Sequence, residues 1–365
     1  MRPEWQDIVK RHLQRQAAGS RRSVLGMASV IAFLMVTGWG MFFAVVLPGH
    51  YEVADRAPFG LGLAFTAFIL GARHAFDADH IAAVDNTTRK LVGEGSRPVS
   101  VGFWFALGHS TVVIVAVTLL AAGLHSLADQ ISDGDSLLAS VTGVWGVIVS
   151  GLFLLLIGTL NLYSFIGIAR VFRQLRSGEY NEAEVEDLLQ NRGLLNRVLA
   201  PLARQIDRPW KMYPVGVLFG LGFDTATTIG LFVIGGSAAL TAPWYVVLVL
   251  PVLFTAGMTL FDTLDGIFMH RAYQWAYARP VRKVYYNLMV TGTSVLVAFL
   301  VAGVGLLGLV AERMQVDSGP VAWIASVNLE NFGFLICALF AATWLAAVAY
   351  WKIGNIEARY SLPDR

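Results

Sequence analysis

PFGLGLAFTAFILGARHAFDADHIAAV, residues 58–84, is the stretch that decides the fold, because it is mostly apolar and long enough to cross a bilayer. Its second half nevertheless carries two imidazoles and two carboxylates, from His74, Asp77, Asp79 and His80. A charged group at bilayer depth costs about 2.5–3.5 kcal/mol, so such groups are functional by default. Imidazole nitrogen and carboxylate oxygen bind borderline divalent cations. The stretch therefore predicts a metal site inside a membrane.

The rest of the chain has the composition of a membrane protein. Of its 365 residues, 56% are hydrophobic and 14% are charged, and the mean hydropathy is +0.60. We expect an all-α, polytopic integral membrane protein with eight transmembrane helices. The apolar segments cover residues 24–47, 58–84, 99–123, 138–165, 213–234, 244–268, 285–310 and 332–351.

The positive charges predict the orientation of these helices. Alternate loops, at residues 1–22, 85–98, 166–212 and 269–284 and after 351, hold six, three, eight, four and three Lys or Arg residues. The four intervening loops hold only Arg56 and Arg313. Cationic loops stay in the cytoplasm. We therefore expect a protein of the cytoplasmic (inner) membrane with both termini in the cytoplasm.

The same pattern divides the chain into five segments. Residues 1–22 form a basic cytoplasmic N-terminal segment, and residues 23–165 form helices one to four with the metal motif in helix two. Residues 166–212 form a cytoplasmic helical loop, residues 213–353 form helices five to eight, and residues 354–365 form a cytoplasmic tail.

Composition also excludes several partners and cofactors. The net charge of +2 comes from the cytoplasmic loops and does not indicate nucleic acid binding. No Gly-x-x-x-x-Gly-Lys-Ser/Thr loop is present in the sequence, so no nucleotide partner is expected. The single cysteine, Cys337, excludes a disulfide framework or a multi-thiolate site. Membrane lipid is the expected surrounding, and the oligomeric state stays open.

Helical geometry limits which donors of residues 74–80 share one ion. At about 100° per residue, His74, Asp77 and His80 form a stripe about 120° wide. Asp79 points nearly opposite to Asp77, so one regular helix cannot aim all four at a single ion. Either Asp79 pairs with another element, or the helix is locally irregular where it lines a polar cavity.

Three further segments offer polar groups at bilayer depth. His109, in residues 99–123, is either a ligand or a group that orients one. Asp224 follows Phe223 in residues 213–234 and would be a buried anion that needs a cation. Asp262 and Asp265 lie at i, i+3 on one face of residues 244–268. Asp262 is the stronger candidate, because Asp265 lies closer to the cytoplasmic end.

A weak internal symmetry links these segments. The Phe-Asp pair at 76–77 recurs at 223–224, 147 residues later, and Phe-x-x-Gly at 105–108 recurs at 254–257, 149 residues later. The paired segments cross the membrane in opposite directions. They therefore predict an inverted repeat that relates helices two to four to helices five to seven, with a site at the midplane.

Residues 73–81, RHAFDADHI, resemble the diagnostic motif of the nickel/cobalt transporter family. That family has a His, four residues and then Asp-His in its second span, which correspond here to His74, Asp79 and His80. The resemblance continues in four later segments: FALGHSTVV at 105–113, LGFDTAT at 221–227, the residues from Gly257-Met258 to Asp265, and Asn328 with the Phe-Gly-Phe run at 332–334.

This resemblance implies eight helices, cytoplasmic termini and high-affinity uptake of Ni²⁺, often with Co²⁺. The metal is then the transported substrate, and no cofactor or enzymatic activity is expected. We predict that Ni²⁺ binds near the membrane middle to His74 and His80 with Asp77 or Asp79. His109, Asp224 and Asp262 would line the site or its approach. One departure leaves the choice between Ni²⁺ and Co²⁺ open: Thr228 stands where the family commonly has Glu.

Other function classes fit the sequence less well. A membrane metalloenzyme is disfavoured because His-Glu-x-x-His is absent from the sequence and seven scattered histidines do not form the boxes of a di-iron enzyme. An efflux carrier is disfavoured because no His-rich cytoplasmic tract is present in the sequence. Mg²⁺ prefers oxygen ligands to imidazole. A structural anchor would leave the buried charges unexplained.

Overall fold

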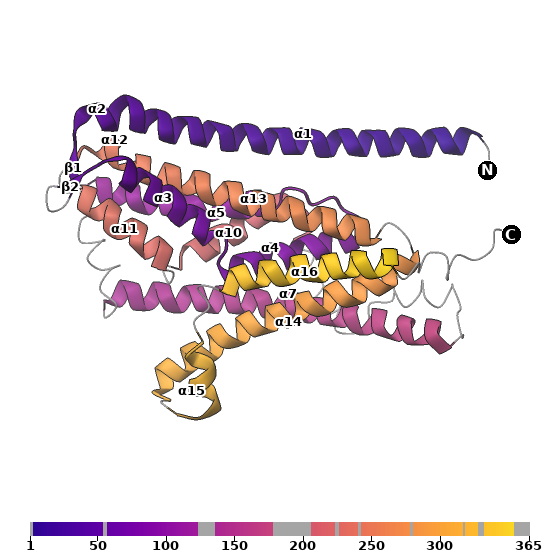
Figure 1. Cartoon of the computed structure of the whole chain (residues 1–365). Coiled ribbons are helices and arrows are strands. Elements are labelled where there is room, and N and C mark those ends of the chain that lie inside the picture. Colours follow the sequence, from indigo (N-terminus) through magenta and orange to yellow (C-terminus); the bar gives the residue numbers. More distant parts are fainter. Residues whose placement is uncertain are drawn as a thin grey trace.

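The computed structural model describes residues 3–53, 57–122, 136–177, 206–222, 226–239, 242–277, 280–316, 318–327 and 332–353. These residues are mainly helical, as Figure 1 shows. The strands among them are β1 (Glu52–Val53) and β2 (Ala57–Pro58), an antiparallel pair in which Glu52 faces Pro58. The expected all-α class is confirmed.

The helices follow one another along the chain with short connections. In order, they are α1 (Pro3–Met41), the π-helical turn Phe42–Val46, α2 (Leu47–Gly49), α3 (Leu61–His74), α4 (Ala78–Gly93), α5 (Val101–Ala121), α7 (Leu137–Ser177), the 3₁₀ turn Pro209–Lys211, α10 (Met212–Gly220), α11 (Ala226–Ala239), α12 (Trp244–Val247), α13 (Val249–Tyr277), α14 (Pro280–Met314), α15 (Gly319–Ala325) and α16 (Phe332–Ile353).

Five stretches of the described residues are long and apolar enough to cross a membrane: Arg21–Gly49, Val101–Ala121, Ser140–Gly167, Trp244–Gln274 and Leu288–Met314. They match the expected first, third, fourth, sixth and seventh spans. The expected second span is divided into α3 and α4, and the fifth into α10 and α11. The apolar part of the eighth is a shorter helix, Phe332–Ala346. A polytopic membrane protein is therefore confirmed, and the count of eight stays a prediction.

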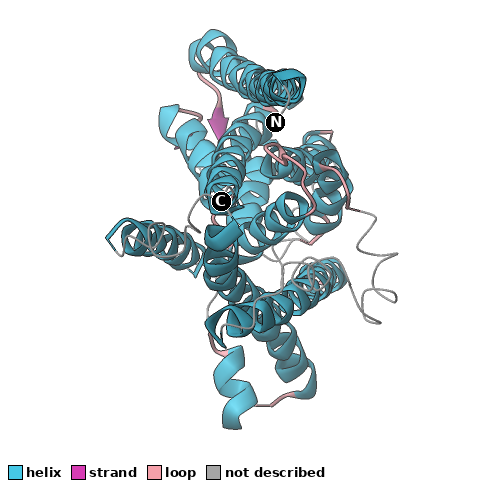
Figure 2. Ribbon diagram, turned by 90° about the vertical axis from the view of Figure 1, so that its right-hand side faces the viewer, coloured by secondary structure: helices cyan, strands magenta, loops and turns pink. Residues whose placement is uncertain are grey.

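The helices pack as a bundle, which Figure 2 views nearly along their axes. On α1, large apolar side chains such as Phe33 and Val36 are exposed, as expected for a surface that faces lipid. The first residues of α1 and the last residues of α16 lie at the same end of the bundle (Figure 1). This end is the predicted cytoplasmic side.

Several helix crossings bring glycines against backbone, and at two of them a glycine of each helix faces a carbonyl of the other. A Cβ on Gly71 of α3 would collide with the Phe254 carbonyl of α13, and one on Gly257 of α13 would collide with the Phe68 carbonyl of α3. Small residues let membrane helices approach this closely. The second crossing joins α5 and α10 in the same way, through Gly108 against Tyr213 and Gly216 against Phe105.

These two crossings correspond to each other. A shift of +145 residues takes positions in α3 to positions in α10, and a shift of −149 takes positions in α13 to positions in α5. The contact of Gly71 with Phe254 therefore corresponds to the contact of Gly216 with Phe105. By the same shifts, the contact of Gly257 with Phe68 corresponds to the contact of Gly108 with Tyr213. An inverted repeat requires such an exchange between halves. The contacts support the repeat, which stays a prediction until the two halves are superposed.

The buried apolar side chains form two main clusters. One includes Ala75 and Phe254 and gathers side chains from the ends of α3, α5, α11 and α13 near the strands. The other includes Ala78 and Phe105 and surrounds α4. Ala75 and Ala78 flank the interruption between α3 and α4, so this interruption lies where the two clusters meet.

Candidate metal site

The site is built on the interruption between α3 and α4. α3 ends at His74, and the amides of Phe76 and Asp77 donate to the carbonyls of Arg73 and His74 at 2.9 Å. Asp77 then adopts an extended conformation (φ −66°, ψ 143°), and α4 begins at Ala78. Of the two alternatives that helical geometry left open, the local irregularity is therefore confirmed. The tight turn changes the direction in which the following side chains point.

Three buried histidines meet at this turn. They are His74 at the end of α3, His80 in the first turns of α4 and His109 on α5, with exposed fractions of 1%, 2% and 3%. One nitrogen of each lies within 4.8 Å of the others. The Nε2 atoms of His74 and His109 are 2.9 Å apart. Imidazole nitrogens bind a borderline ion such as Zn²⁺ at about 2.0–2.1 Å, so nitrogens on one ion lie roughly 3–4 Å apart. The three rings have the spacing of a metal site.

Two carboxylates lie near the Nδ1 atoms of two of these rings. Asp77 Oδ2 lies 2.8 Å from His74 Nδ1, and Asp262 Oδ2 of α13 lies 3.7 Å from His80 Nδ1. Asp77 occupies the N-cap position of α4, but its side chain makes no capping hydrogen bond. A carboxylate on the outer nitrogen fixes the tautomer and orientation of a ligating imidazole. At 2.8 Å, Asp77 is placed to fix the tautomer of His74 with Nε2 turned toward an ion, whereas Asp262 lies beyond hydrogen-bond distance of His80.

α13 presents further polar atoms on the same side as Asp262. The hydroxyls of Thr259 and Thr263 and both oxygens of Asp262 are buried without a hydrogen-bond partner among the described residues, as is His109 Nδ1. Buried polar groups normally have partners. On α13 these exceptions lie within one helical turn of Asp262, whose carboxylate faces His80, and they offer lone pairs to a cation.

Aromatic rings enclose this polar group. Phe105 packs edge-on against His80 at a centroid distance of 4.8 Å, and Phe254 lies 5.7 Å from His74. Phe76, within the turn, stacks on Phe334 of α16 at 4.8 Å. Apolar walls of this kind lower the local dielectric constant, which strengthens electrostatic interactions inside them.

The structure brings five of the seven predicted residues together: His74, Asp77, His80, His109 and Asp262. Asp79 accepts a hydrogen bond from the backbone amide of His80 at 3.0 Å, in the first turn of α4. An acidic side chain is favourable there because of the helix dipole. Asp224 lies outside the described residues. The ligand role of all seven stays a prediction.

Sequence reasoning assigned no role to several neighbours of the site. Ser110 Oγ donates to the sulfur of Met258 at 3.5 Å, which joins α5 to α13 beside His109. Thr259 and Thr263 share a face of α13 with Asp262, and their i, i+3, i+4 spacing is the signal that could have identified them.

The chain resembles proteins of known function over most of its length. Residues 60–350 match the model of a family described as "High-affinity nickel-transport protein". The chain is 50% identical over 341 residues to the nickel transporter NicT of Mycobacterium tuberculosis, covering 93% of this chain and 91% of that protein. No solved structure matches the chain.

Two other relatives differ in the metal that they are named for. The nickel transporter NixA of Staphylococcus aureus is 40% identical over 342 residues, which cover 93% of this chain and 98% of NixA. The cobalt transport protein NhlF of Rhodococcus rhodochrous is 38% identical over 335 residues, which cover 90% of this chain and 92% of NhlF.

Proposed function

The chain belongs to the high-affinity nickel-transport protein family, and we propose that it takes up Ni²⁺ across the cytoplasmic membrane through the site of His74, His80 and His109. The observation that carries this proposal is the meeting of three buried imidazoles at the interrupted helix. Family members are transporters, so the chain is a transporter and not an enzyme. The membrane metalloenzyme alternative is therefore wrong.

The membrane potential can drive this uptake. A potential of 100 mV, negative inside, favours inward movement of a dication by about 4.6 kcal/mol, twice the value for a single charge. This corresponds to an accumulation of roughly a thousandfold. No nucleotide or cofactor is needed for such transport, and membrane lipid is the remaining expected partner.

Co²⁺ is a second candidate substrate. The relative NhlF is named a cobalt transport protein, and imidazole and carboxylate donors bind Co²⁺ and Ni²⁺ with affinities that follow a common order. Thr228, where the family commonly has Glu, is buried on α11 with 1% exposure. The neutral hydroxyl of Thr228 replaces the carboxylate of Glu, and this loss of negative charge affects the preference between Ni²⁺ and Co²⁺.

We expect cells that express the protein to accumulate radiolabelled Ni²⁺ at low external concentration. Excess Co²⁺ should compete strongly, and Mg²⁺ should not compete, because it prefers oxygen ligands and keeps its waters. A protonophore distinguishes transport driven by potential or protons from facilitated exchange. Cells with an empty vector are the control. Net loss of Ni²⁺ from preloaded cells, or uptake competed equally by Mg²⁺, would contradict the proposal.

Acid should weaken metal binding by the purified protein. Imidazole binds metal only when it is neutral, so protons compete with the metal at every histidine that is a ligand. We expect the dissociation constant for Ni²⁺, measured by titration calorimetry in detergent, to rise by at least about tenfold between pH 7.5 and pH 5.5. An affinity that stays constant over this range would mean that protons do not compete with the metal for any ligating histidine, and it would contradict this prediction.

A further inference from the structure

The second half of α4 carries buried polar side chains that the metal site does not use. Asp85, Asn86 and Arg89 are 0%, 0% and 3% exposed. Asp85 follows His80 by five residues, which is about 7.5 Å along a helix. α3 begins beside the strands, and α4 follows it toward the end of the bundle where both termini lie (Figure 1), so the chain from His80 to Asp85 runs toward the predicted cytoplasmic end. These side chains therefore lie on the inward side of the site.

Hydrogen bonds tie this half of α4 to three other helices. The Tyr273 hydroxyl of α13 donates to Asp85 Oδ1 and lies 3.2 Å from Ser294 Oγ of α14. Arg89 Nη1 donates to the hydroxyl of Thr291 on α14 at 2.8 Å. Asn161 Nδ2 of α7 donates to Asn86 Oδ1 at 2.6 Å.

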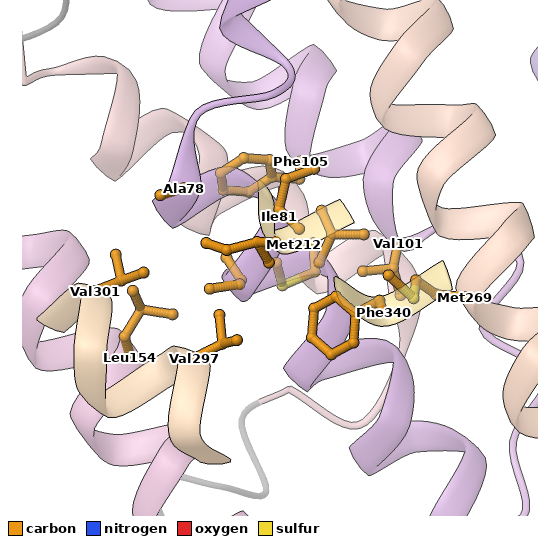
Figure 3. Packing of buried hydrophobic residues seen from close by; sticks show 14 of the residues in the cluster. Ala78, Ile81, Val101, Phe105, Leu154, Met212, Met269, Val297, Val301 and Phe340 are labelled. Carbon is orange, nitrogen blue, oxygen red and sulfur yellow. The ribbon is translucent and has the colours of Figure 1, made fainter. Parts of the chain in front are cut away.

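Apolar side chains close the same region. Ile81, Met269 and Phe340, from α4, α13 and α16, belong to one buried cluster (Figure 3). Val84 lies on α4 between His80 and Asp85 and is 0% exposed. A cation that leaves the imidazoles toward the cytoplasm must displace this packing. The described side chains beside this half of α4 are thus buried and packed together.

The polar groups of α4 are not fully used in this arrangement. Asp85 Oδ2 and the Nε and Nη2 atoms of Arg89 are buried without a hydrogen-bond partner among the described residues. A buried charge with free hydrogen-bonding atoms is unfavourable for stability alone. A helix with a second arrangement, in which these atoms find other partners, explains why such groups are present. The turn at residues 75–77 separates α4 from α3 and supplies a pivot for that movement.

We propose that Tyr273 and Asp85 form a latch that holds α4 closed on the cytoplasmic side of the site and opens when the metal leaves. The latch rests on the proposed transport function, because it assigns the inward step of that transport. Tyr273 and Asp85 are positioning residues here: they act on α4 and do not touch the metal.

Tyr273→Phe tests the latch because it removes the hydroxyl and keeps the ring. Cys337 is the only cysteine in the sequence, so Cys337→Ala with Val84→Cys leaves one reactive thiol on the closed route. A membrane-impermeant maleimide is applied to inside-out vesicles. We expect Tyr273→Phe to raise the labelling rate at position 84 by at least about fivefold, since a hydrogen bond to a carboxylate biases the closed state by that order. An unchanged labelling rate would overturn the proposal.

Tyr213→Phe is the matched control. The Tyr213 hydroxyl also lies between two helices, 2.9 Å from Thr111 Oγ1, but it ties α10 to α5 and not to α4. We expect it to leave labelling at position 84 unchanged. If Tyr213→Phe accelerates labelling as much as Tyr273→Phe, general loosening is the cause and the latch is wrong.

A double-mutant cycle tests the pairing itself. Asp85→Leu removes the acceptor, so it should accelerate labelling as Tyr273→Phe does, and the double variant should add little further. If the two substitutions instead multiplied their effects on the labelling rate, the two residues would act independently, and the latch would be contradicted. Ni²⁺ affinity in detergent should stay within about twofold for Tyr273→Phe, because the metal-binding groups are intact. The labelling experiment does not require transport. A protein that fails to take up Ni²⁺ would refute the proposed function, and the labelling rates would still test the latch separately.

Discussion

We expect His74→Ala to abolish high-affinity nickel uptake. His74 is the centre of the site: its Nδ1 lies 2.8 Å from Asp77 Oδ2, and its Nε2 lies 2.9 Å from His109 Nε2. Removal of a group that only orients a ligand typically costs 10–100-fold in metal affinity. Loss of the ligand itself should cost at least about 100-fold. Radiolabelled Ni²⁺ uptake at low concentration and titration calorimetry on the purified protein measure the two effects.

His50→Asn is the control for this experiment. His50 is an exposed histidine in the turn after α2, with a positive φ of 47°. Asn tolerates this left-handed conformation, so the substitution removes an imidazole with little strain. Uptake should be unchanged. Full high-affinity uptake by His74→Ala at equal expression would refute the site assignment.

We expect Gly333→Ala to destabilise the protein and to reduce uptake by more than about tenfold. Gly333 lies in the first turn of α16, where a Cβ would collide with the carbonyl oxygen of Phe76. Phe76 belongs to the turn that sets His74 and Asp77 in position. The collision is with backbone, so neither partner can move aside by changing a rotamer. Overpacking of this kind costs about 1–3 kcal/mol, and any shift of the turn displaces the imidazoles.

Gly303→Ala is the matched control for this substitution. Gly303 is also a helical glycine, on α14, but a Cβ there would have no atom of the described residues within 4 Å. Ala is favoured over Gly in a helix by up to about 1 kcal/mol, so Gly303→Ala should be neutral or stabilising. The midpoint of thermal unfolding in detergent and Ni²⁺ uptake are measured for both variants. Equal midpoints and equal uptake would mean that α16 does not hold the turn.

Much of the site could be anticipated from the sequence because its signals are local. An apolar run of membrane length with His and Asp inside it is visible in one segment. The geometry of residues 74–80 also required either a partner for Asp79 or an irregular helix, and the structure has the irregular helix. What the sequence could not specify was which donor pairs with which. Asp77 pairs with His74 across one turn, whereas Asp262 reaches His80 from a different helix.

The sequence by itself determined the membrane class, the apolar segments and the chemical type of the donors, since these depend on side-chain composition within single segments. Only the tertiary structure decided the meeting of His74 with His109, 35 residues apart, and of Asp85 with Tyr273, 188 residues apart. Such contacts depend on how closely helices cross, and at several crossings that closeness depends on glycines facing backbone. Periodicity within one helix predicts which face is buried, but it carries no information on which helix covers that face.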